Sequence, residues 1–426
     1  RIMSKAIYWF RNDLRIEDNE PFNKAQELHE QVIPVYILDK DWLEGSQFGI
    51  EKMGAHRLRF LLESLVDLKN KLLQLGSSLH FRIGDPVEEL GAIQKEFNCS
   101  KLYGQKASAH NEEKQEKQLM DLMPCSFLWG ETLYHIDDLD FPVDELPEVF
   151  TQFRKAVEKK LKVRGVVETP IKLNAPEGIG THIPSLRELD FEEPEKDDRA
   201  VLQFKGGATA GKERLEYYLW DQELLANYKQ TRNGLIGGDY SSKFSPWLAH
   251  GCLSSRQIYW QVKKFEKCVK KNSSTYWLVF ELIWRDYFHF VAKKYGNKLY
   301  LRQGILGEDK VEWGSDKLFH LWRDGKTKEP FVDANMREMN ATGFMSNRGR
   351  QNVASYLMHT MKIDWRLGAA YFEKMLIDYD PCSNYGNWIY IAGVGNDPRG
   401  GREFNTERQK QMYDPKGEYQ ELWAHS

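Results

Sequence analysis

The first third of this 426-residue chain alternates short apolar runs with helical patterns, and this alternation most constrains the fold. Between residues 53 and 75, leucines recur at helical spacing, and Gly76 follows as a helix stop. Strands that are separated by helices form parallel sheets covered on both faces, so we predict a doubly wound parallel α/β domain. The predicted strands are Lys5–Phe10, Val32–Leu38, Leu79–Ile83, Lys101–Tyr103 and Ser126–Trp129.

The rest of the chain has a different pattern. Residues 136–205 contain six prolines and acidic runs, which predict a long linker with one helix near Glu148–Lys162. From Gly211 onward, long helical patterns predominate. The length alone indicates more than one domain. We therefore predict an α/β domain over residues 1–135, the linker over 136–205 and an all-α domain over 206–426.

Charge is distributed unevenly along the chain. Residues 1–200 hold 27 Lys+Arg against 37 Asp+Glu, whereas the remainder holds 33 against 26, together with ten of the 13 tryptophans. A basic, aromatic half is typical of a polyanion-binding surface, and tryptophans that fill a large helical core are the alternative. We expect any polyanion to bind the C-terminal part.

The five cysteines are scattered and form no CxxC pair, which argues against a disulfide framework and against a cysteine-rich metal site. No apolar run approaches the roughly 20 residues that span a bilayer, and the first residues lack the apolar core of a signal peptide. We expect a monomeric, cytoplasmic protein of the bacterial type, with no membrane partner and no metal.

The segment Gly206–Lys212 has the glycine and lysine spacing of a phosphate-binding P-loop. Glu213 follows, however, where a serine or threonine would hold magnesium, and no buried strand precedes the motif. We therefore predict that this segment does not bind a nucleotide.

Four segments of the second half combine polar and aromatic residues, namely 228–247, 277–288, 342–351 and 364–390. In the first, three serines and a lysine beside a helix start can hold phosphates through backbone N–H groups and the helix dipole, and an ordinary helix cap is the alternative. In the second, Glu281 and Arg285 stand at i,i+4 on a helix, where a surface ion pair above a core stripe is the alternative.

Together with the start Trp9–Arg15, the strings Asp333–Arg337, Ser346–Arg350 and Asp380–Trp388 resemble the photolyase/cryptochrome flavoprotein family, and within it the DASH cryptochrome branch. The resemblance extends over nearly the whole chain, to Tyr413–Pro415. It implies an N-terminal α/β antenna domain, a wrapping linker and an all-α domain that binds FAD folded into a U shape. It also implies the activity of a deoxyribodipyrimidine photolyase of the DASH type.

The resemblance implies which residues hold the flavin. Arg285 matches the arginine beside the flavin, and Arg350 with Asp378 matches an ion pair over the isoalloxazine ring. Asn384 matches the residue that faces flavin N5, where an amide can accept from N5–H or donate to the deprotonated nitrogen. The residues that match the phosphate and ribityl site and a neighbouring acidic position are Tyr228, Ser241, Ser242, Lys243, Phe244, Ser245 and Asp380.

The family repairs cyclobutane pyrimidine dimers by donating an electron from excited, reduced FAD, after which the ring splits and the electron returns. Three tryptophans refill the flavin from the surface, and Trp388, Trp365 and Trp313 match them. Core packing is the alternative for each of these tryptophans.

A pyrimidine dimer leaves the base stack to reach the flavin, at a lower cost than a paired base. Glu281 and Asn347 match its polar contacts, and Trp284 matches one aromatic wall of the pocket. The second wall, commonly a tryptophan, is Tyr390 here, and this smaller ring fits the branch's preference for dimers in single-stranded DNA. Candidate phosphate contacts are Arg232, Arg348 and the lysines of residues 263–271, for which a solvated helix face is the alternative.

Members of the branch often carry 5,10-methenyltetrahydrofolate as an antenna beside a glutamate, for which Glu112 is the best match, and a charged helix start is the alternative. Two other functions stay open. One is a blue-light photoreceptor that signals through flavin photoreduction with little or no repair. The other is a flavin-dependent redox protein that binds nucleic acid only through general charge. The pocket residues Glu281, Asn347 and Trp284 favour repair.

Overall fold

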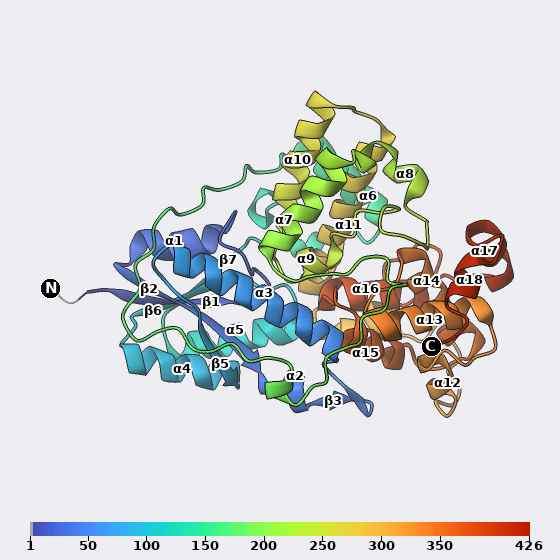
Figure 1. The fold of residues 1–426 in the computed structure, drawn as a ribbon, viewed down its shortest axis with the longest axis horizontal. Helices are drawn as coiled ribbons and strands as arrows, with labels where there is room; N and C mark the ends of the chain where they lie inside the picture. Colours follow the sequence, from blue (N-terminus) through green and yellow to red (C-terminus); the bar gives the residue numbers. More distant parts are fainter. Residues whose placement is uncertain (1–2) are drawn as a thin grey trace.

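The computed structural model describes residues 3–426, which form a lobe built on a parallel sheet and a larger helical lobe (Figure 1). Five strands pair in parallel in the order β5-β2-β1-β6-β7, and a short antiparallel pair, β3 with β4, lies apart from them. The strands are β1 Lys5–Phe10, β2 Gln31–Asp39, β3 Ser46–Gln47, β4 Ile50–Glu51, β5 His80–Gly84, β6 Lys101–Gln105 and β7 Cys125–Leu128.

Helices cover both faces of the sheet, as the near-continuous apolar strands predict. Along β1, Ile7 and Trp9 face one core, beneath α4 and α5, whereas Tyr8 and Phe10 face another, beneath α1 and α3. The second core continues into the helical lobe. The predicted doubly wound sheet is confirmed. The helices of this lobe are α1 Glu20–Leu28, α2 Lys40–Glu44, α3 Ala55–Gln74, α4 Pro86–Phe97 and α5 His110–Leu122.

The remaining helices build the second lobe, with α6 packed against α11, and the predicted all-α class is confirmed. They are α6 Phe150–Lys160, α7 Ala208–Glu216, α8 Tyr228–Thr231, α9 Ser245–Ala249, α10 Ser255–Cys268, α11 Ser273–Tyr295, α12 Phe319–Arg323, α13 Pro330–Thr342, α14 Asn347–Ser355, α15 Trp365–Met375, α16 Pro381–Ala392, α17 Thr406–Tyr413 and α18 Glu418–Leu422. No helix within residues 3–426 is long and apolar enough to cross a membrane.

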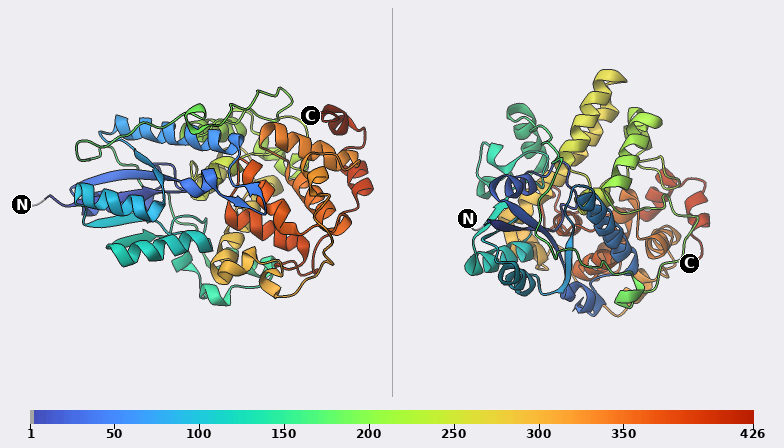
Figure 2. Two further views of the ribbon diagram at one scale, coloured as in Figure 1. Left: turned by 90° about the horizontal axis from the view of Figure 1, so that it is seen from below. Right: turned by 60° about the vertical axis from the view of Figure 1, so that its left-hand side comes forward.

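The linker runs as an extended segment along both lobes, and its one regular element after α6 is the 3₁₀ turn Arg187–Leu189 (Figure 2). Backbone hydrogen bonds join it to the first lobe, with Val32 N donating to Asn174 O at 3.0 Å and Leu173 N to Leu75 O at 2.8 Å. These bonds hold the extended part of the linker against the sheet lobe, although residues 173 and 174 belong to no helix or strand. The boundaries 1–135, 136–205 and 206–426 stay our proposed division.

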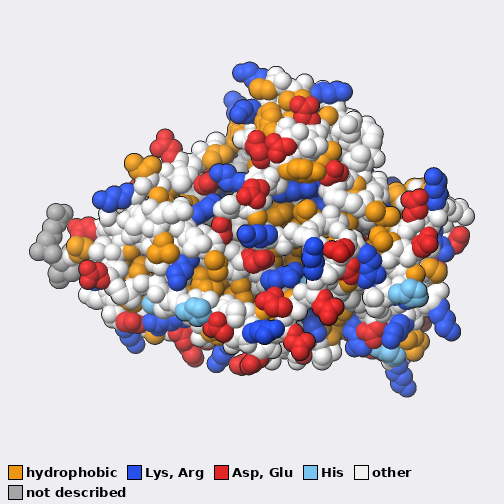
Figure 3. Space-filling view, in the orientation of Figure 1, with side chains coloured by type: hydrophobic (Ala, Val, Ile, Leu, Met, Phe, Trp, Pro, Cys, Tyr) orange, Lys and Arg blue, Asp and Glu red, His pale blue; other side chains and the backbone are white. Residues whose placement is uncertain are grey.

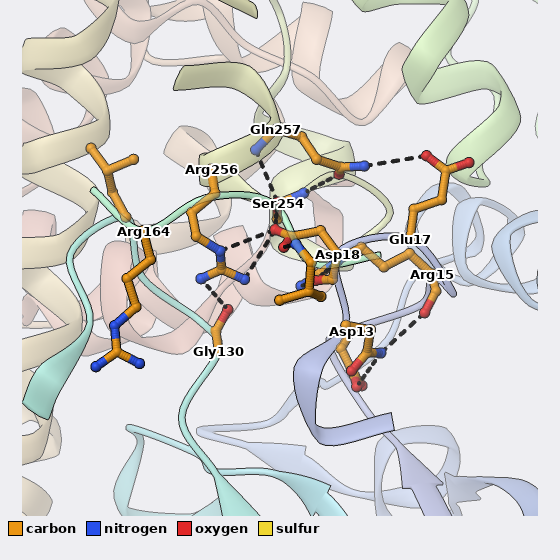
Figure 4. Close-up of polar contacts among 12 residues, drawn as sticks. Asp13, Arg15, Glu17, Asp18, Gly130, Arg164, Ser254, Arg256 and Gln257 are labelled. Atoms are coloured by element: carbon orange, nitrogen blue, oxygen red, sulfur yellow. Dashed lines mark hydrogen bonds and ion pairs between the residues drawn. The ribbon is translucent and has the colours of Figure 1, made fainter. Parts of the chain in front are cut away.

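The carboxyl end of β1 meets the helical lobe in a buried polar cluster (Figure 4). Arg15 Nη1 donates to the Gly251 carbonyl at 3.0 Å, and Arg256 Nε donates to Asp18 Oδ2 at 3.0 Å. Gly251 has a φ of 68°, and a Cβ there would lie 1.9 Å from the Asn12 carbonyl oxygen. Because only glycine permits this approach, the contact fixes α9 and α10 relative to the sheet.

Charged side chains of both signs are interspersed over the surface shown in Figure 3. Basic side chains gather at the outer end of α10, at the top of that view. Lys264, Lys267, Lys270 and Lys271 are exposed at this end. The predicted lysine cluster therefore lies on a projecting, solvated helix end.

Candidate functional site

A cavity of about 640 Å³, within the size range of cofactor sites, lies between α8, α9, α11, α14 and α16. A second cavity, of about 110 Å³, shares Arg350, Asp378 and Asp380 with it. The predicted residues that line the larger cavity are Tyr228, Arg232, Ser241, Ser242, Lys243, Phe244, Ser245, Glu281, Trp284, Arg285, Asn347, Arg348, Arg350, Asp378, Asp380 and Tyr390. Asn384 and Trp388 line the smaller cavity. Among the described residues, Trp365, Trp313 and Glu112 lie outside both.

One end of the larger cavity is the loop of residues 240–245, which carries hydroxyl groups and a buried lysine. Arg214 shapes this loop by donating to the carbonyl oxygens of Ser242, at 2.9 Å, and Ser241, at 3.0 Å. Lys243, with a left-handed φ of 56°, donates through Nζ to Ser241 Oγ at 3.0 Å. Burial, together with the charge of Arg214, lowers the pKa of Lys243 to about 6. A phosphate bound here would restore the ammonium charge.

The helix that follows this loop is too short to support the predicted contribution of a helix dipole. α9 spans only five residues, and Pro246 within its first turn has no N–H to offer. The hydroxyls and the lysine, and not a macrodipole, are therefore the groups that can hold phosphates.

Arg350 and Asp378 form a two-pronged ion pair at the junction of the two cavities. Arg350 Nη1 lies 2.9 Å from Asp378 Oδ1, and Nη2 lies 2.8 Å from Oδ2. Ser245 Oγ donates to the same carboxylate at 2.7 Å, and Arg350 Nε donates to the Met345 carbonyl at 2.8 Å. Both partners are thus held in one orientation.

Asp380 pairs with a buried histidine that was not predicted. His289 Nε2 lies 3.1 Å from Asp380 Oδ2, and Nδ1 lies 3.2 Å from Glu131 Oε1, in the segment that follows β7. Burial opposes charge on His289, yet the two carboxylates hold its pKa well above the ordinary value. Burial alone would likewise raise the pKa of Asp380, but the His289 imidazolium holds it well below its usual range.

Cys382 lies in the same cluster, since its sulfur and ligand atoms of His289 and Asp380 lie within 4.8 Å of one another. Burial raises the pKa of the Cys382 thiol to about 12, so the sulfur stays protonated. His289 and its two carboxylate partners form an ion-paired cluster with the thiol beside it.

Glu281 lies in the wall of the larger cavity and accepts a hydrogen bond from the Tyr228 hydroxyl. Burial raises its pKa to about 7, against the lowering effects of Tyr228 and Arg232. Arg285, one turn on, donates through Nη1 to the Glu131 carbonyl at 2.7 Å. No ion pair joins Glu281 to Arg285 among the described residues, so the alternative of a surface pair is wrong.

Two aromatic side chains of the cavity wall, Trp284 and Tyr390, contact each other. Trp284 stacks on Phe150 with ring centroids 3.7 Å apart, and its indole lies edge-on to Tyr390 at 5.8 Å. Arg402 Nη2 donates to the Tyr390 hydroxyl at 3.3 Å and pairs with the buried carboxylate of Asp397. Tyr390 is therefore held by a cation from the loop after α16, which was not predicted.

The two arginines predicted to contact DNA phosphates are both held by aromatic rings. The Arg232 guanidinium lies 4.8 Å from the Trp277 ring centroid, and that of Arg348 lies 4.4 Å from Tyr413. Asn347 begins α14 beside them, after the N-cap Ser346. Asn384 is fixed through Nδ2, which donates to the Ala369 carbonyl at 3.1 Å.

The three predicted tryptophans do not stack directly on one another among residues 3–426. Trp388 packs edge-on against Phe372 at 5.0 Å, and its ring fills the space of the Cβ that Gly368 lacks. Gly368 is on α15, one turn after Trp365, so these two tryptophans are on packed helices. Trp313 is partly exposed and donates through Nε1 to Asp309 at 3.0 Å.

Glu112 lies in the first turn of α5, away from both cavities. Its Oε2 is buried and has no hydrogen-bond partner among the described residues. Burial raises its pKa to about 7. Because an unpaired buried carboxylate is costly, this atom is a candidate acceptor for a ligand's N–H group.

Sequence reasoning missed His289, Glu131, Arg214 and Arg402. Each of these residues affects the site through another residue that it contacts. These contacts join segments that are far apart in the sequence, so only the structure shows them. The one available signal was chemical, since buried acidic neighbours such as Asp380 require a cation.

Comparisons with known proteins agree with this geometry. Residues 6–176 match the family model "DNA photolyase", and residues 277–425 match "FAD binding domain of DNA photolyase". The chain is 49% identical over 425 residues to Cryptochrome DASH of Gloeobacter violaceus, covering 98% of this chain and 85% of that protein. It is 48% identical over 429 residues to Cryptochrome DASH of Xenopus laevis, covering 98% and 82%.

A solved structure, that of Synechocystis sp. PCC6803 cryptochrome, superposes with a TM-score of 0.94 at 45% identity, covering 99% of this chain and 89% of that one. The chain belongs to the photolyase/cryptochrome family, in its DASH branch. It carries the family's FAD-binding domain. The residues present fit this cofactor, because the cavity offers hydroxyls and a desolvated lysine and, in contact with them through Ser245, the Arg350–Asp378 pair.

Proposed function

We propose that the protein repairs cyclobutane pyrimidine dimers in single-stranded DNA under blue light. When bound, reduced FAD supplies the electron that splits the dimer and takes it back. The observation that carries the proposal is that most of the residues proposed to hold the flavin share one cavity with the carboxyl group of Glu281 and the aromatic side chains of Trp284 and Tyr390. A flipped base needs this combination of stacking surface and hydrogen-bonding groups.

Glu281 and Asn347 bind the polar edge of the dimer in this proposal. With a pKa of about 7, Glu281 is partly protonated at neutral pH and donates a hydrogen bond to a dimer carbonyl as negative charge develops there. Tyr228 orients this carboxyl group through its hydroxyl. Trp284 and Tyr390 offer the aromatic surface against which the dimer packs, and Arg232 and Arg348 contact the phosphates.

The helical lobe would hold the flavin through residues that line the two cavities. Tyr228, Ser241, Ser242, Lys243, Phe244 and Ser245 surround the phosphates and ribityl chain, and Arg285, Arg350, Asp378, Asp380 and Asn384 surround the ring. Trp388, Trp365 and Trp313 pass electrons inward from the surface. Glu112 accepts a hydrogen bond from a 5,10-methenyltetrahydrofolate antenna through Oε2, the carboxylate oxygen that has no partner among the described residues.

The repair assay uses oligothymidine that contains dimers, the purified reduced protein and blue light. We expect dimers to disappear in the light and to persist in the dark. Glu281→Gln keeps a hydrogen-bond donor, so we expect it to repair with a weaker dependence on pH than wild type. Wild-type repair should fall as the pH rises through about 7, because the donating form of Glu281 is lost. Persistence of dimers in illuminated wild type would refute the proposal.

The flavin placement is tested by Arg350→Ala and Asp378→Ala. Each variant leaves its partner charge without a counterion beside the cofactor, so we expect both to lose most of their FAD. The ratio of flavin absorbance to protein absorbance measures the loss. Lys264→Ala, at the exposed end of α10, is the control and should keep its FAD. Full occupancy in both cavity variants would contradict the placement.

Trp388→Phe tests the electron path. We expect this variant to lose photoreduction of oxidised FAD by external donors, while repair by the chemically reduced protein stays largely intact. The reason is that the path refills the flavin and takes no part in dimer splitting. Absorbance during illumination measures photoreduction, and an unchanged rate would remove Trp388 from the path.

Signalling by flavin photoreduction is the second candidate function. It is favoured by the aromatic residues between the smaller cavity and the surface, which serve a receptor equally well. A protein that photoreduces its flavin but leaves dimers intact in the repair assay would be a receptor.

A further inference from the structure

Glu373 on α15 binds two tyrosine hydroxyls that the proposed function does not use. Tyr379 donates to Glu373 Oε1 at 2.8 Å, and Tyr385 donates to the same oxygen at 3.2 Å. Gln47, from the sheet lobe, donates to Oε2 at 3.1 Å. The carboxylate is 9% exposed, and Tyr385 is 4% exposed. The structure thus places an acidic acceptor and two phenols together in the interior.

Of the two tyrosines, Tyr385 is the one in contact with the proposed electron path. Its ring lies edge-on to Trp365, with centroids 6.1 Å apart. Tyr385 is on α16, one turn before Trp388, so it is next to two of the three proposed tryptophans. Tyr379 instead has the Arg57 guanidinium 4.5 Å from its ring centroid, and no aromatic contact of Tyr379 exists among the described residues.

We propose that Tyr385 is a further electron donor on the tryptophan path and that Glu373 accepts its proton. The oxidant is the Trp365 radical cation, formed when Trp365 has passed an electron towards light-excited, oxidised flavin. One electron moves from Tyr385 to Trp365 while the phenolic proton moves to Glu373. The products are neutral Trp365, a neutral tyrosyl radical and a neutral carboxyl group. The proposal rests on the proposed function through the role of Trp365.

Burial gives this step its driving force. Before it, the interior holds a positive indole, the Glu373 carboxylate and the buried Arg57 guanidinium, and after it only the guanidinium keeps its charge. Oxidising the phenol without a base would instead move the buried positive charge onto Tyr385, and the interior would keep a costly cation. Burial and the nearby Glu373 hold the pKa of Tyr385 well above its ordinary value, so the phenol keeps its proton until it is oxidised.

The test is time-resolved optical and electron paramagnetic resonance spectroscopy of the oxidised holoprotein under blue light. We expect a tyrosyl radical that follows a tryptophanyl radical in wild type, and only the tryptophanyl radical in Tyr385→Phe. The matched control is Tyr379→Phe, which removes the other hydroxyl on Glu373 and should keep the tyrosyl signal. Glu373→Gln keeps the hydrogen-bond acceptor but removes the base, so tyrosyl formation should slow by about 100-fold or more.

A wild type that forms no tyrosyl radical, or one whose radical persists in Tyr385→Phe, would overturn the proposal. So would a Glu373→Gln variant with an unchanged rate. Repair by chemically reduced protein does not use this step, which separates the two proposals. Intact repair without a tyrosyl radical removes Tyr385 alone, whereas a tyrosyl radical without repair supports Tyr385 and refutes repair.

Discussion

Replacing His289 by glutamine is expected to lower the free energy of unfolding by about 3–5 kcal/mol. The imidazolium lies between Glu131, from the sheet lobe, and Asp380, at the start of α16, at 3.2 and 3.1 Å. Glutamine removes the cation and leaves two buried carboxylates uncompensated. Because one partner belongs to each side of the interface, the lobes should also come apart more readily. Urea unfolding monitored by tryptophan fluorescence measures the effect.

The pH dependence of this difference has a definite sign. The pKa of His289 in the folded protein is raised above the ordinary value of about 6.5. The contribution of His289 to the free energy of unfolding is therefore fully present below about pH 6.5. It is lost as the pH rises through the raised value. We therefore expect the difference in free energy of unfolding between wild type and His289→Gln to become smaller in alkaline solution.

The matched control for His289 is His182→Gln. His182 Nε2 lies 2.9 Å from Glu188 Oε2 in the linker, but both side chains are largely exposed to solvent. Because exposed pairs contribute little, this variant should unfold like wild type. Equal effects of the two substitutions, or a gap that widens in alkaline solution, would contradict the role of His289.

Binding of dimers is expected to be tight for single strands and poor for intact duplex. Extruding a dimer from a duplex costs a few kcal/mol, so the duplex penalty should be roughly tenfold to a thousandfold. Tyr390, as the second wall, offers less stacking area than an indole would. The dissociation constants for a single strand, a duplex and a bubble, measured at fixed salt, give the penalty. Salt should weaken all three without reversing their order.

Tyr390→Trp should narrow the gap between single strand and duplex, since base–aromatic stacking is worth about 1–3 kcal/mol. Arg232→Ala is the control, because loss of a phosphate contact should weaken both substrates alike. Equal repair of single strand and duplex by wild type would contradict the preference. If wild type prefers single strands and Tyr390→Trp shows the same preference, the size of this ring does not cause it. The cause of the strand preference would then lie in the surrounding loops, such as the one that carries Arg402.

Much of the architecture was predictable because its signals are local. The apolar run Lys5–Phe10 became β1, and the leucine pattern after Met53 became α3, which ends before Gly76. The residues of the cavity also came from linear motifs, since Ser346–Arg350 and Asp380–Trp388 each place several side chains on one helix start. Periodicity and motif order are properties of the chain alone, so no tertiary contact was needed to read them.

Other features depended on which segments meet. Gly206 resembles part of a P-loop, but a Cβ there would lie 2.1 Å from the Phe60 carbonyl oxygen, so its glycine permits close packing on α3. His289 had no distinctive neighbours in sequence, because its partners, Glu131 and Asp380, lie 158 residues before it and 91 after it. Tyr385 and Glu373 likewise meet only where α15 and α16 pack. The sequence by itself determined the helices, the strands and the residues that line the cavities. The tertiary structure decided which charged groups are buried together and which group can take a proton from another. Burial and pairing arise only when distant segments pack.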